Sequence, residues 1–319
     1  MRRFVYMIMT MVMAVLMLGA CQRRPFAEYN SKVNLILNIN TDIQNHEVTK
    51  LPENMRVDMF DPISGDLIYT DYVGPNGGYI HPNPGTYDLI VYSIGSETTI
   101  IHNEYHFNEI EAYTNEVQSY LRSKGDNTSD VSSEIPVVYE PEHTFVGWYH
   151  NLIVPIAHED EEVQEMQIEV DANTIVETWQ VEIRNVDGTE WISEVAGIAC
   201  GQRGSVYIGP NASSDRVVKV MFELQIEEND NGGKCLKGKY SSFGVHESHS
   251  ETVFLDLSVK KKGGLYQYFH FNITDQMVDN DKRYILIEDS ILIDESSGGG
   301  GGFLPVIDDW DDIQTDIKL

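Results

Sequence analysis

Four residues near the amino terminus have the types and order of a lipid-attachment site. The stretch LGAC at 18–21 is typical of a lipobox, in which a signal peptidase cleaves between Ala20 and Cys21 and the Cys21 thiol carries a diacylglyceryl group. The apolar run 4–18 follows two arginines and is shorter than the roughly 20 residues of a spanning helix, as in a secretory signal. We therefore expect a signal peptide at 1–20 and membrane attachment through diacylglyceryl and acyl (palmitate) lipid. An ordinary signal peptide followed by a chance cysteine is the alternative.

The rest of the sequence contains none of the common catalytic motifs. There is no Gly-x-Ser-x-Gly elbow, no phosphate-binding glycine loop with a lysine and no His-Glu-x-x-His zinc motif. The 51 Asp and Glu residues offer many carboxylate pairs, but sequence spacing does not give the distance between carboxylates. We predict a protein that is not an enzyme and uses no cofactor. A lipid-tethered glycoside hydrolase is the alternative, and it needs two carboxylates about 5 to 9 Å apart in a cleft.

One histidine pair is the best metal candidate in the chain. His246 and His249 are flanked by Glu247 and Glu251. Residues three apart on a strand point to opposite faces, so both imidazoles could reach one ion only across a turn. The acidic loop 227–233 has oxygen ligands but lacks the spacing of a calcium loop. We interpret both segments as polar loops and predict no metal site.

Two cysteines and three tryptophans leave alternatives open. Cys200 and Cys235 could form a disulfide in an oxidising compartment or remain separate thiols, and their spacing favours neither. Trp148, Trp179 and Trp191 could form a stacking platform for a glycan or fill the core of a β-sandwich, where aromatic residues are more common. A glycan-binding surface lipoprotein is therefore a second candidate function.

The elements that must position these residues are strands. Apolar residues alternate with polar ones along many segments, which is the pattern of strands with one face in a core and one in water. Such segments are centred on 33–39, 57–59, 87–91, 166–170, 179–183, 218–226, 253–259 and 269–273. Turn pairs such as Asp61-Pro62, Pro84-Gly85 and Gly263-Gly264 separate them. Only 108–121 has the composition of a helix, so we predict an all-β chain of two tandem antiparallel β-sandwiches, transthyretin-like or immunoglobulin-like.

Composition shifts predict the domain boundaries. After the signal peptide we expect a lipidated tether at 21–31, a first sandwich at 32–155 and a second at 156–294. Pro155 and the acidic run 158–162 mark the boundary between the sandwiches. The segment 295–319 begins with a glycine-rich linker and ends in FLPVIDDWDDIQTDIKL, whose apolar residues predict a strand-like tail made for contact.

The formal net charge of −29 limits the partners of the protein. Phosphate groups would be repelled, which argues against nucleic acid and against anionic lipid surfaces. Attachment through lipid rather than through charge is consistent with this balance.

Two motifs and the lipobox together resemble a known family. PGTYDLIVY at 84–92 resembles the Pro-Gly-x-Tyr-x-x-x-Val-Tyr strand entry of transthyretin-like sandwiches, and VIDDW at 306–310 resembles the apolar and acidic endings of fimbrillin-like proteins. A long alternating strand also follows Cys21 within about a dozen residues. The chain thus resembles the fimbrillin-associated anchor and accessory lipoproteins of Bacteroidales-type bacteria, including related families of unknown function.

The resemblance implies a non-enzymatic, lipid-anchored outer-membrane protein that serves a pilus in adhesion. It implies contact with fimbrial subunits by strand addition, with Val306, Trp310 and Ile313 of the tail as anchors. Val306 and Trp310 share one strand face whereas Ile313 lies on the other, so a regular strand does not place all three in one groove. Docking of the tail on its own second sandwich is the alternative. No cleavable arginine follows the first strand, which favours an uncleaved anchor or accessory subunit over a polymerising one.

Overall fold

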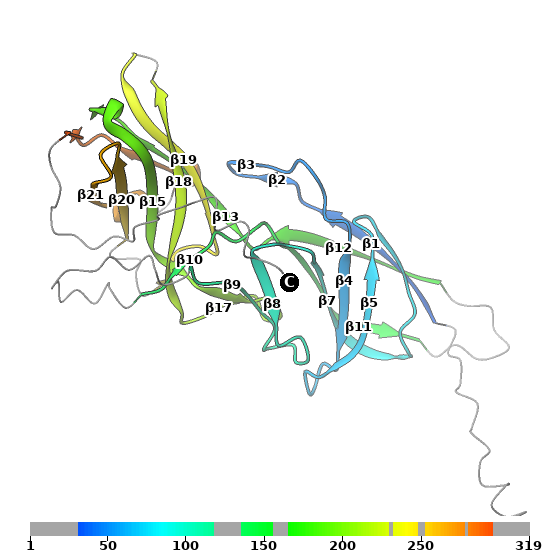
Figure 1. The fold of residues 1–319 in the computed structure, drawn as a ribbon. Helices are drawn as coiled ribbons and strands as arrows, with labels where there is room; N and C mark the ends of the chain where they lie inside the picture. Colours follow the sequence, from blue (N-terminus) through cyan, green and yellow to red (C-terminus); the bar gives the residue numbers. More distant parts are fainter. Residues whose placement is uncertain are drawn as a thin grey trace, which may run out of the picture.

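The computed structural model describes residues 31–117, 135–155, 165–229, 232–247, 253–277 and 280–295. Within these ranges the chain is nearly all strand, and helix is limited to α2 (Thr274–Met277) and a 3-10 turn at Thr189–Trp191. The strands form two β-sandwiches that lie end to end in an elongated molecule, blue to cyan for one and largely yellow to orange for the other (Figure 1). The predicted all-β class and the two sandwiches are confirmed.

The first sandwich contains seven strands in the order β5-β4-β7-β11-β12-β1-β6. Their bounds are β1 Lys32–Ile39, β4 Met55–Phe60, β5 Leu67–Val73, β6 Gly77–Ile80, β7 Gly85–Ser93, β11 Phe145–Val154 and β12 Glu165–Thr174. The layer β12-β1-β6 meets the layer β5-β4-β7-β11 at a corner, where Phe145 pairs with Thr174. Alternate residues of β1, namely Val33, Leu35 and Leu37, are buried in the core between the layers, as their period of two predicts.

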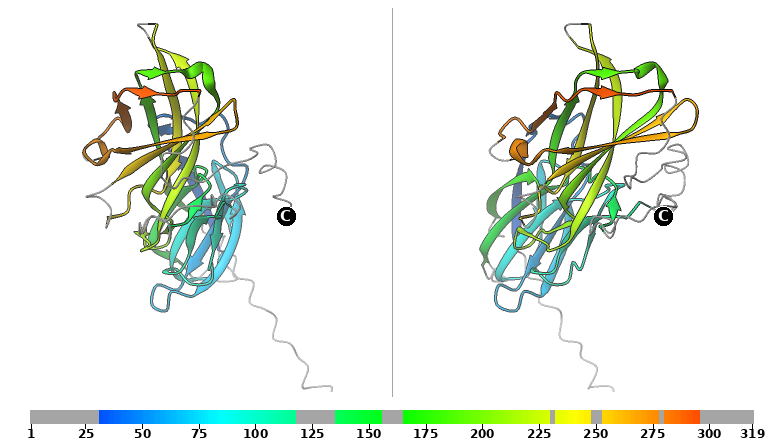
Figure 2. Two further views of the ribbon diagram at one scale, coloured as in Figure 1. Left: turned by 60° about the vertical axis from the view of Figure 1, so that its left-hand side comes forward. Right: turned by 90° about the vertical axis from the view of Figure 1, so that its left-hand side faces the viewer.

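The second sandwich is built on the strand order β21-β20-β15-β18-β19-β13-β22. Their bounds are β13 Glu177–Ile183, β15 Ile192–Arg203, β18 Val217–Glu228, β19 Lys234–Ser242, β20 Phe254–Lys261, β21 Tyr266–Asn272 and β22 Tyr284–Ile287. A short parallel pair, β14 (Val186–Asp187) with β23 (Ile291–Leu292), lies over one end of the core. Figure 2 shows the same strands in two further views. Most pairs are antiparallel, but β1 with β12 and β13 with β22 are parallel.

A small hybrid sheet joins the two sandwiches. Its order is β17-β16-β9-β8, with β8 Thr99–His102, β9 Glu111–Thr114, β16 Ser205–Tyr207 and β17 Ala212–Ser213. β8 and β9 come from the first half of the chain and β16 and β17 from the second, so the central pair β9–β16 crosses between them. In the same way β10 (Val137–Val138) pairs with β18. The sandwiches are therefore interleaved rather than simply consecutive.

A separate core fills the space beneath the hybrid sheet. It contains Phe60, Ile90, Tyr92, Ile110, Ala112 and Val146 from the first half of the chain, and Val176, Val206, Ile208 and Phe243 from the second. Nearly all of these side chains are fully buried. Burial of apolar surface is favourable, so this shared core stabilises the arrangement of the two sandwiches relative to each other.

Two expectations from sequence differ from the structure. The stretch 108–121, the one with the composition of a helix, forms no helix in its described part 108–117, because β9 occupies 111–114 and pairs on both sides within the hybrid sheet. The boundary predicted at 155/156 precedes β12, whereas the sheet order places β12 in the first sandwich. β11 and β12, which lie on either side of Pro155 in the sequence, belong to the same sandwich, and the crossover to the second sandwich comes at 175–176.

Candidate functional site

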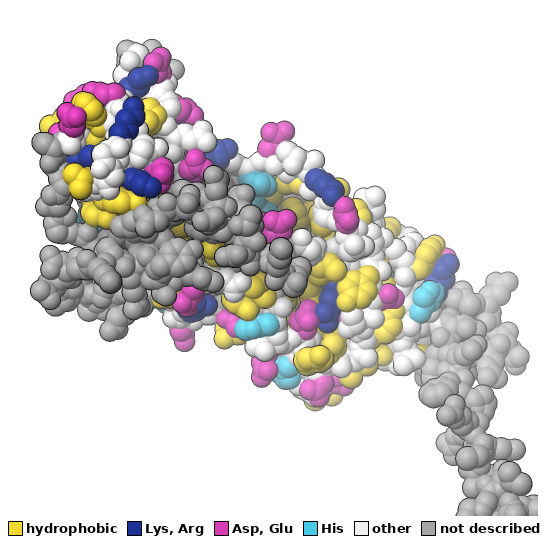
Figure 3. All heavy atoms as spheres, in the orientation of Figure 1, with side chains coloured by type: hydrophobic (Ala, Val, Ile, Leu, Met, Phe, Trp, Pro, Cys, Tyr) yellow, Lys and Arg dark blue, Asp and Glu magenta, His cyan; other side chains and the backbone are white. Residues whose placement is uncertain are grey.

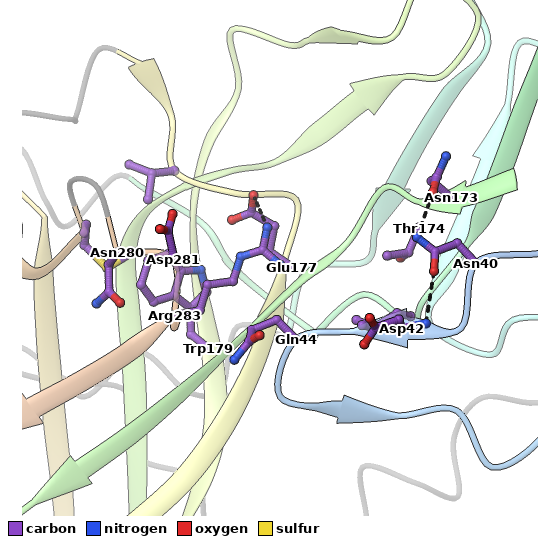
Figure 4. Close-up of a pocket in the computed structure, with 13 residues that line it drawn as sticks. Asn40, Asp42, Gln44, Asn173, Thr174, Glu177, Trp179, Asn280, Asp281 and Arg283 are labelled. Atoms are coloured by element: carbon purple, nitrogen blue, oxygen red, sulfur yellow. Dashed lines mark hydrogen bonds and ion pairs between the residues drawn. The ribbon is translucent and has the colours of Figure 1, made fainter. Parts of the chain in front are cut away.

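One hollow of the described chain lies at the seam, the boundary between the two sandwiches. It has a volume of about 660 Å³ and is bounded by the β2–β3 hairpin of the first sandwich (β2 Asp42–Ile43, β3 His46–Glu47) and by β13 and the start of β22 (Figure 4). We call it the seam cleft. Its lining residues are Asn40, Asp42, Ile43, Gln44, Asn173, Thr174, Glu177, Trp179, Val245, Met277, Asn280, Asp281 and Arg283.

The hairpin wall of the cleft is fixed to the second sandwich by Asn45. Asn45 has φ 62°, a left-handed conformation that asparagine tolerates better than most residues. Its Nδ2 donates to the carbonyl oxygens of Lys282 at 3.0 Å and Arg283 at 2.9 Å. Lys239 Nζ donates back to the Asn45 carbonyl at 2.8 Å. One turn residue therefore ties the hairpin to β19 and to the segment just before β22 of the other sandwich.

His143 ties the two sides of the crossover together. Its Nδ1 lies 2.8 Å from Thr174 Oγ1, at the end of β12, and its Nε2 lies 2.8 Å from Thr178 Oγ1, at the start of β13. The ring of His46 stands against it with centroids 4.0 Å apart. Burial, and then the nearby charges of His46 and Arg283, lower the pKa of His143 to about 4. The ring is neutral at pH 7, so one nitrogen donates and the other accepts.

The floor of the cleft carries one ion pair and one unsatisfied donor. Arg283 Nη2 donates to Glu177 Oε1 at 3.2 Å, and Arg283 has φ 46°, an uncommon conformation for arginine. Trp179 is 4% exposed, and its Nε1 has no hydrogen-bond partner. Asp42 and Asp281 are exposed, and their carboxylates make no ion pair with another described residue. Three carboxylates against one guanidinium give the cleft a local excess of negative charge.

A second hollow of about 340 Å³ continues along the crossover. It shares Asn173, Thr174, Glu177 and Arg283 with the seam cleft and reaches the hybrid sheet at Asn211 and Ser213. The two hollows together form an elongated trough. Outside it, acidic and basic side chains are interspersed over both sandwiches on the face drawn in Figure 3.

The tryptophans named as a glycan platform do not gather on a surface. Trp179 is buried in the second core. Trp191 is half-buried and packs against the same core. Trp148 is half-buried against the shared core, and its Nε1 donates to the carbonyl oxygen of Ile208 at 2.8 Å. The core interpretation is thus the one that fits these three side chains.

Cys200 and Cys235 are separate free thiols. Cys200 lies on β15 and Cys235 on β19, with β18 between them. Their neighbours on β18, Val220 beside Ala199 and Glu227 beside Cys235, are seven positions or about 23 Å apart. A disulfide needs Cα atoms within about 7 Å, so the fold places these cysteines too far apart for one.

Several residues named from sequence lie outside the described ranges. They are Ala20 and Cys21 of the lipobox, His249 and Glu251 of the histidine motif, and Val306, Trp310 and Ile313 of the tail. His246 is described and buried, and its backbone N–H donates to the carbonyl oxygen of Gly201 at 2.9 Å. Among the described residues no group of three or more His, Cys, Asp or Glu could hold a metal ion. Within the same ranges no helix has the length and apolarity to cross a bilayer.

Sequence reasoning missed the seam cleft. Its walls come from 40–44, 173–179 and 280–283, which are distant in sequence and meet only because the sandwiches are interleaved. The Gln44-Asn45 pair between two short strands is the one local signal of the hairpin, because asparagine favours tight turns. Nothing in the sequence around His143 indicates that it faces two threonines.

Comparisons with known proteins give one family and a group of structural neighbours. The model of the family described as "Domain of unknown function (DUF5119)" matches residues 20–223. A Bacteroides ovatus protein named "Putative fimbrium anchoring subunit Fim4B" is 24% identical over 230 residues, which are 72% of this chain. That match spans 63% of the length of the relative.

Two solved structures are similar to this chain to different degrees. A crystal structure of a "putative adhesin" from Bacteroides ovatus superposes with a TM-score of 0.57 at 21% identity, covering 88% of this chain and 98% of that one. The fimbrial anchor protein Mfa2 from Porphyromonas gingivalis gives a TM-score of 0.47 at 12% identity, over 79% of this chain and 87% of that one.

Proposed function

The chain belongs to the DUF5119 family, whose model matches more than half of its length, and we propose that it is an anchoring or accessory subunit of a surface fimbrium. The observation that carries the proposal is the match over 72% of the chain to a protein named as a fimbrium anchoring subunit. The double sandwich, shared at a TM-score of 0.57 with a protein described as an adhesin, supports it. Both names describe binding proteins, which favours a structural role over catalysis.

Attachment to the outer membrane would occur at Cys21. Cleavage after Ala20 would leave Cys21 as the first residue, joined to lipid and followed by the short tether 22–31. Two or more acyl chains give stable anchoring, whereas the tether offers little apolar surface of its own. Exposure on the cell surface is the arrangement in which such a subunit could hold a fimbrium.

A cysteine substitution tests this attachment. Cys21→Ala should remove palmitate labelling and move the protein from the membrane fraction to the soluble fraction. Cys200→Ala is the matched control, because it removes a thiol from β15 and leaves the lipobox intact. Membrane retention of Cys21→Ala would contradict lipid attachment at this residue.

Contact with fimbrial subunits would use the tail by strand addition. An extended segment can add its backbone to a sheet edge or groove of a partner, with apolar side chains as anchors. Val306, Trp310 and Ile313 are the candidate anchors, and 295–302 would give the reach. The tail is acidic, so a receiving groove should be basic or neutral at its rim and capture should weaken with salt.

Deletion of 303–319 tests the tail. The truncated protein should lose capture of fimbrial subunits in a pull-down, while its circular dichroism and thermal unfolding stay unchanged. Undiminished capture would remove the strand-addition mechanism. If the truncation instead lowers the thermal stability, the tail docks on its own second sandwich.

No observation favours the glycoside hydrolase alternative. The seam cleft does contain carboxylates, but Glu177 is engaged by Arg283. The hydrolase therefore has only the abundance of acidic residues in its favour.

A further inference from the structure

The seam cleft is lined by hydrogen-bond donors and acceptors that have no partner among the described residues. Asp42 and Asp281 offer carboxylate oxygens without an ion-pair partner among the described residues. Asn40 Nδ2 donates to Asn173 Oδ1 at 3.1 Å, which engages the oxygen of that amide and leaves its Nδ2 free to donate. Arg283 donates from Nη2 to Glu177, and its guanidinium has further N–H groups that can donate. Free acceptors and free donors therefore line the same hollow.

This mixture selects against several classes of ligand. A metal ion needs converging acceptors alone, and no group of described residues could hold one. An anion would be repelled by the excess of carboxylates over guanidinium. A purely cationic ligand would satisfy Asp42 and Asp281 but would leave the N–H groups of Asn173 and Arg283 without acceptors. A hydroxyl group both donates and accepts, so a ligand rich in hydroxyls satisfies both kinds of group at once.

The shape of the hollow fits an extended ligand. The seam cleft of about 660 Å³ lies in the usual size range of small-molecule sites, and the second hollow of about 340 Å³ continues it past Glu177 and Arg283. Figure 4 shows Asp281, Arg283 and Trp179 at one end and Asp42, Asn40 and Asn173 at the other. A ligand that reaches both groups must span both sandwiches.

The walls are also held before any ligand arrives. Asn45 fixes the hairpin that carries Asp42 and Gln44, and His143 fixes both ends of the crossover that carries Asn173 and Glu177. Preorganised polar groups lose less entropy on binding.

We propose that the seam cleft is a binding site for a neutral oligosaccharide, whose hydroxyl groups bridge the aspartates and amides of the two sandwiches. The proposal is independent of the fimbrial assignment and does not use the tail. It does not depend on an aromatic platform: Trp179 lines the seam cleft and Trp148 the second hollow, but Trp179 belongs to one core and Trp148 packs against another.

The test uses full-length protein in a detergent without a sugar headgroup. Mannotriose, cellotriose and triacetylchitotriose serve as neutral probes, and trilysine and sialyllactose as charged ones, in saturation-transfer NMR followed by calorimetric titration. We expect saturable binding of at least one neutral trisaccharide in the millimolar range or tighter. The double variant Asp42→Ala with Asp281→Ala should weaken that binding by about tenfold or more, because a site built for hydroxyls then loses two acceptors.

A matched control separates the site from overall charge. Asp215→Ala with Asp289→Ala removes two exposed aspartates outside the cleft and should leave the affinity unchanged. Deletion of 303–319 should also leave it unchanged, so a failure here is distinct from a failure of the fimbrial proposal. Absence of binding to every neutral probe, equal binding by the Asp42/Asp281 variant, or binding of trilysine alone would each overturn the proposal.

Discussion

Neutral His143 links the two sandwiches because its two ring nitrogens form hydrogen bonds with two threonines, one on each side of the crossover. Thr174 ends β12 and Thr178 lies in β13, so the imidazole spans the point where the chain passes between sandwiches. Protonation would turn the accepting nitrogen into a donor and place a charge beside His46 and Arg283. The seam should therefore weaken in acid.

His143 should make stability depend on pH in a defined window. Its folded pKa of about 4 lies below the ordinary 6.5, so the unfolded chain binds the proton first and stability is lost as pH falls from about 6.5 towards 4. Allowing for the solvent that reaches the ring, we expect a loss of about 1–2 kcal/mol. Urea unfolding of His143→Gln, whose amide can still donate and accept, should show a shallower pH dependence. Identical slopes for the two proteins would contradict this role.

The thiols of Cys200 and Cys235 should be free and slow to react. Burial, and then the Asp256 carboxylate, raise the pKa of Cys200, whose Sγ lies 3.6 Å from Asp256 Oδ2. Burial also raises the pKa of Cys235. Because the thiolate is the nucleophile, maleimide labelling of Cys200 and Cys235 should be slow in the folded protein and fast in denaturant. A mass two hydrogens lower in the non-reduced protein, or rapid labelling before unfolding, would contradict the separate, buried thiols.

Among the elements, the hybrid sheet depends on one close approach of backbones. Ile208, directly after β16, donates its N–H to the carbonyl oxygen of Ile110 at 2.8 Å. At the next residue, a Cβ on Gly209 would lie 1.7 Å from the carbonyl oxygen of Phe107. Only glycine allows the second half of the chain to lie this close to the first.

Gly209→Ala should therefore loosen the join between the sandwiches. The new methyl group must displace the backbone at Phe107, and we expect a loss of about 3 kcal/mol in the free energy of unfolding. Gly263→Ala is the control, because its Cβ would meet nothing within 4 Å, and it should change stability by less than about 0.5 kcal/mol. Chemical denaturation of both variants measures the difference. Equal stabilities would show that the backbones can separate without cost.

The strands were predictable and their partners were not. Sequence alternation locates β1, whose burial also has a period of two, and it locates β7, β18 and β20, although these are buried on both faces along much of their length. The composition of 108–121 favours a helix, but pairing of β9 with β16, nearly a hundred residues later, decides the structure of 111–114. The seam cleft escaped prediction for the same reason, since Asn45, His143 and Arg283 meet only after the halves interleave.

The protein has a formal net charge of −29, but its acidic side chains are not gathered on the face drawn in Figure 3. On the surface drawn in Figure 3 basic side chains lie among the acidic ones. Several are paired, such as Lys237 with Glu182 and Glu227 and Lys260 with Glu194. Glu182 is buried and Lys237 and Lys260 are half-buried, and all of these pairs join strands within the second sandwich. The two sandwiches are joined instead by the shared apolar core and by the hydrogen bonds of Asn45 and His143.

That shared core predicts a single unfolding transition for a chain that contains two sandwiches. Phe60, Ile90 and Tyr92 of the first sandwich are buried against Val206, Ile208 and Phe243, which the second half of the chain supplies. Unfolding either sandwich alone would expose this core and break β9–β16 and β10–β18, so intermediates with one sandwich folded should be scarce. Differential scanning calorimetry of residues 22–319 should give one endotherm, with equal van't Hoff and calorimetric enthalpies. Gly209→Ala should shift or split that endotherm, whereas Gly263→Ala should not. Two resolved endotherms for the unmodified chain would mean that the sandwiches are stable separately and that the hybrid sheet is only a contact between them.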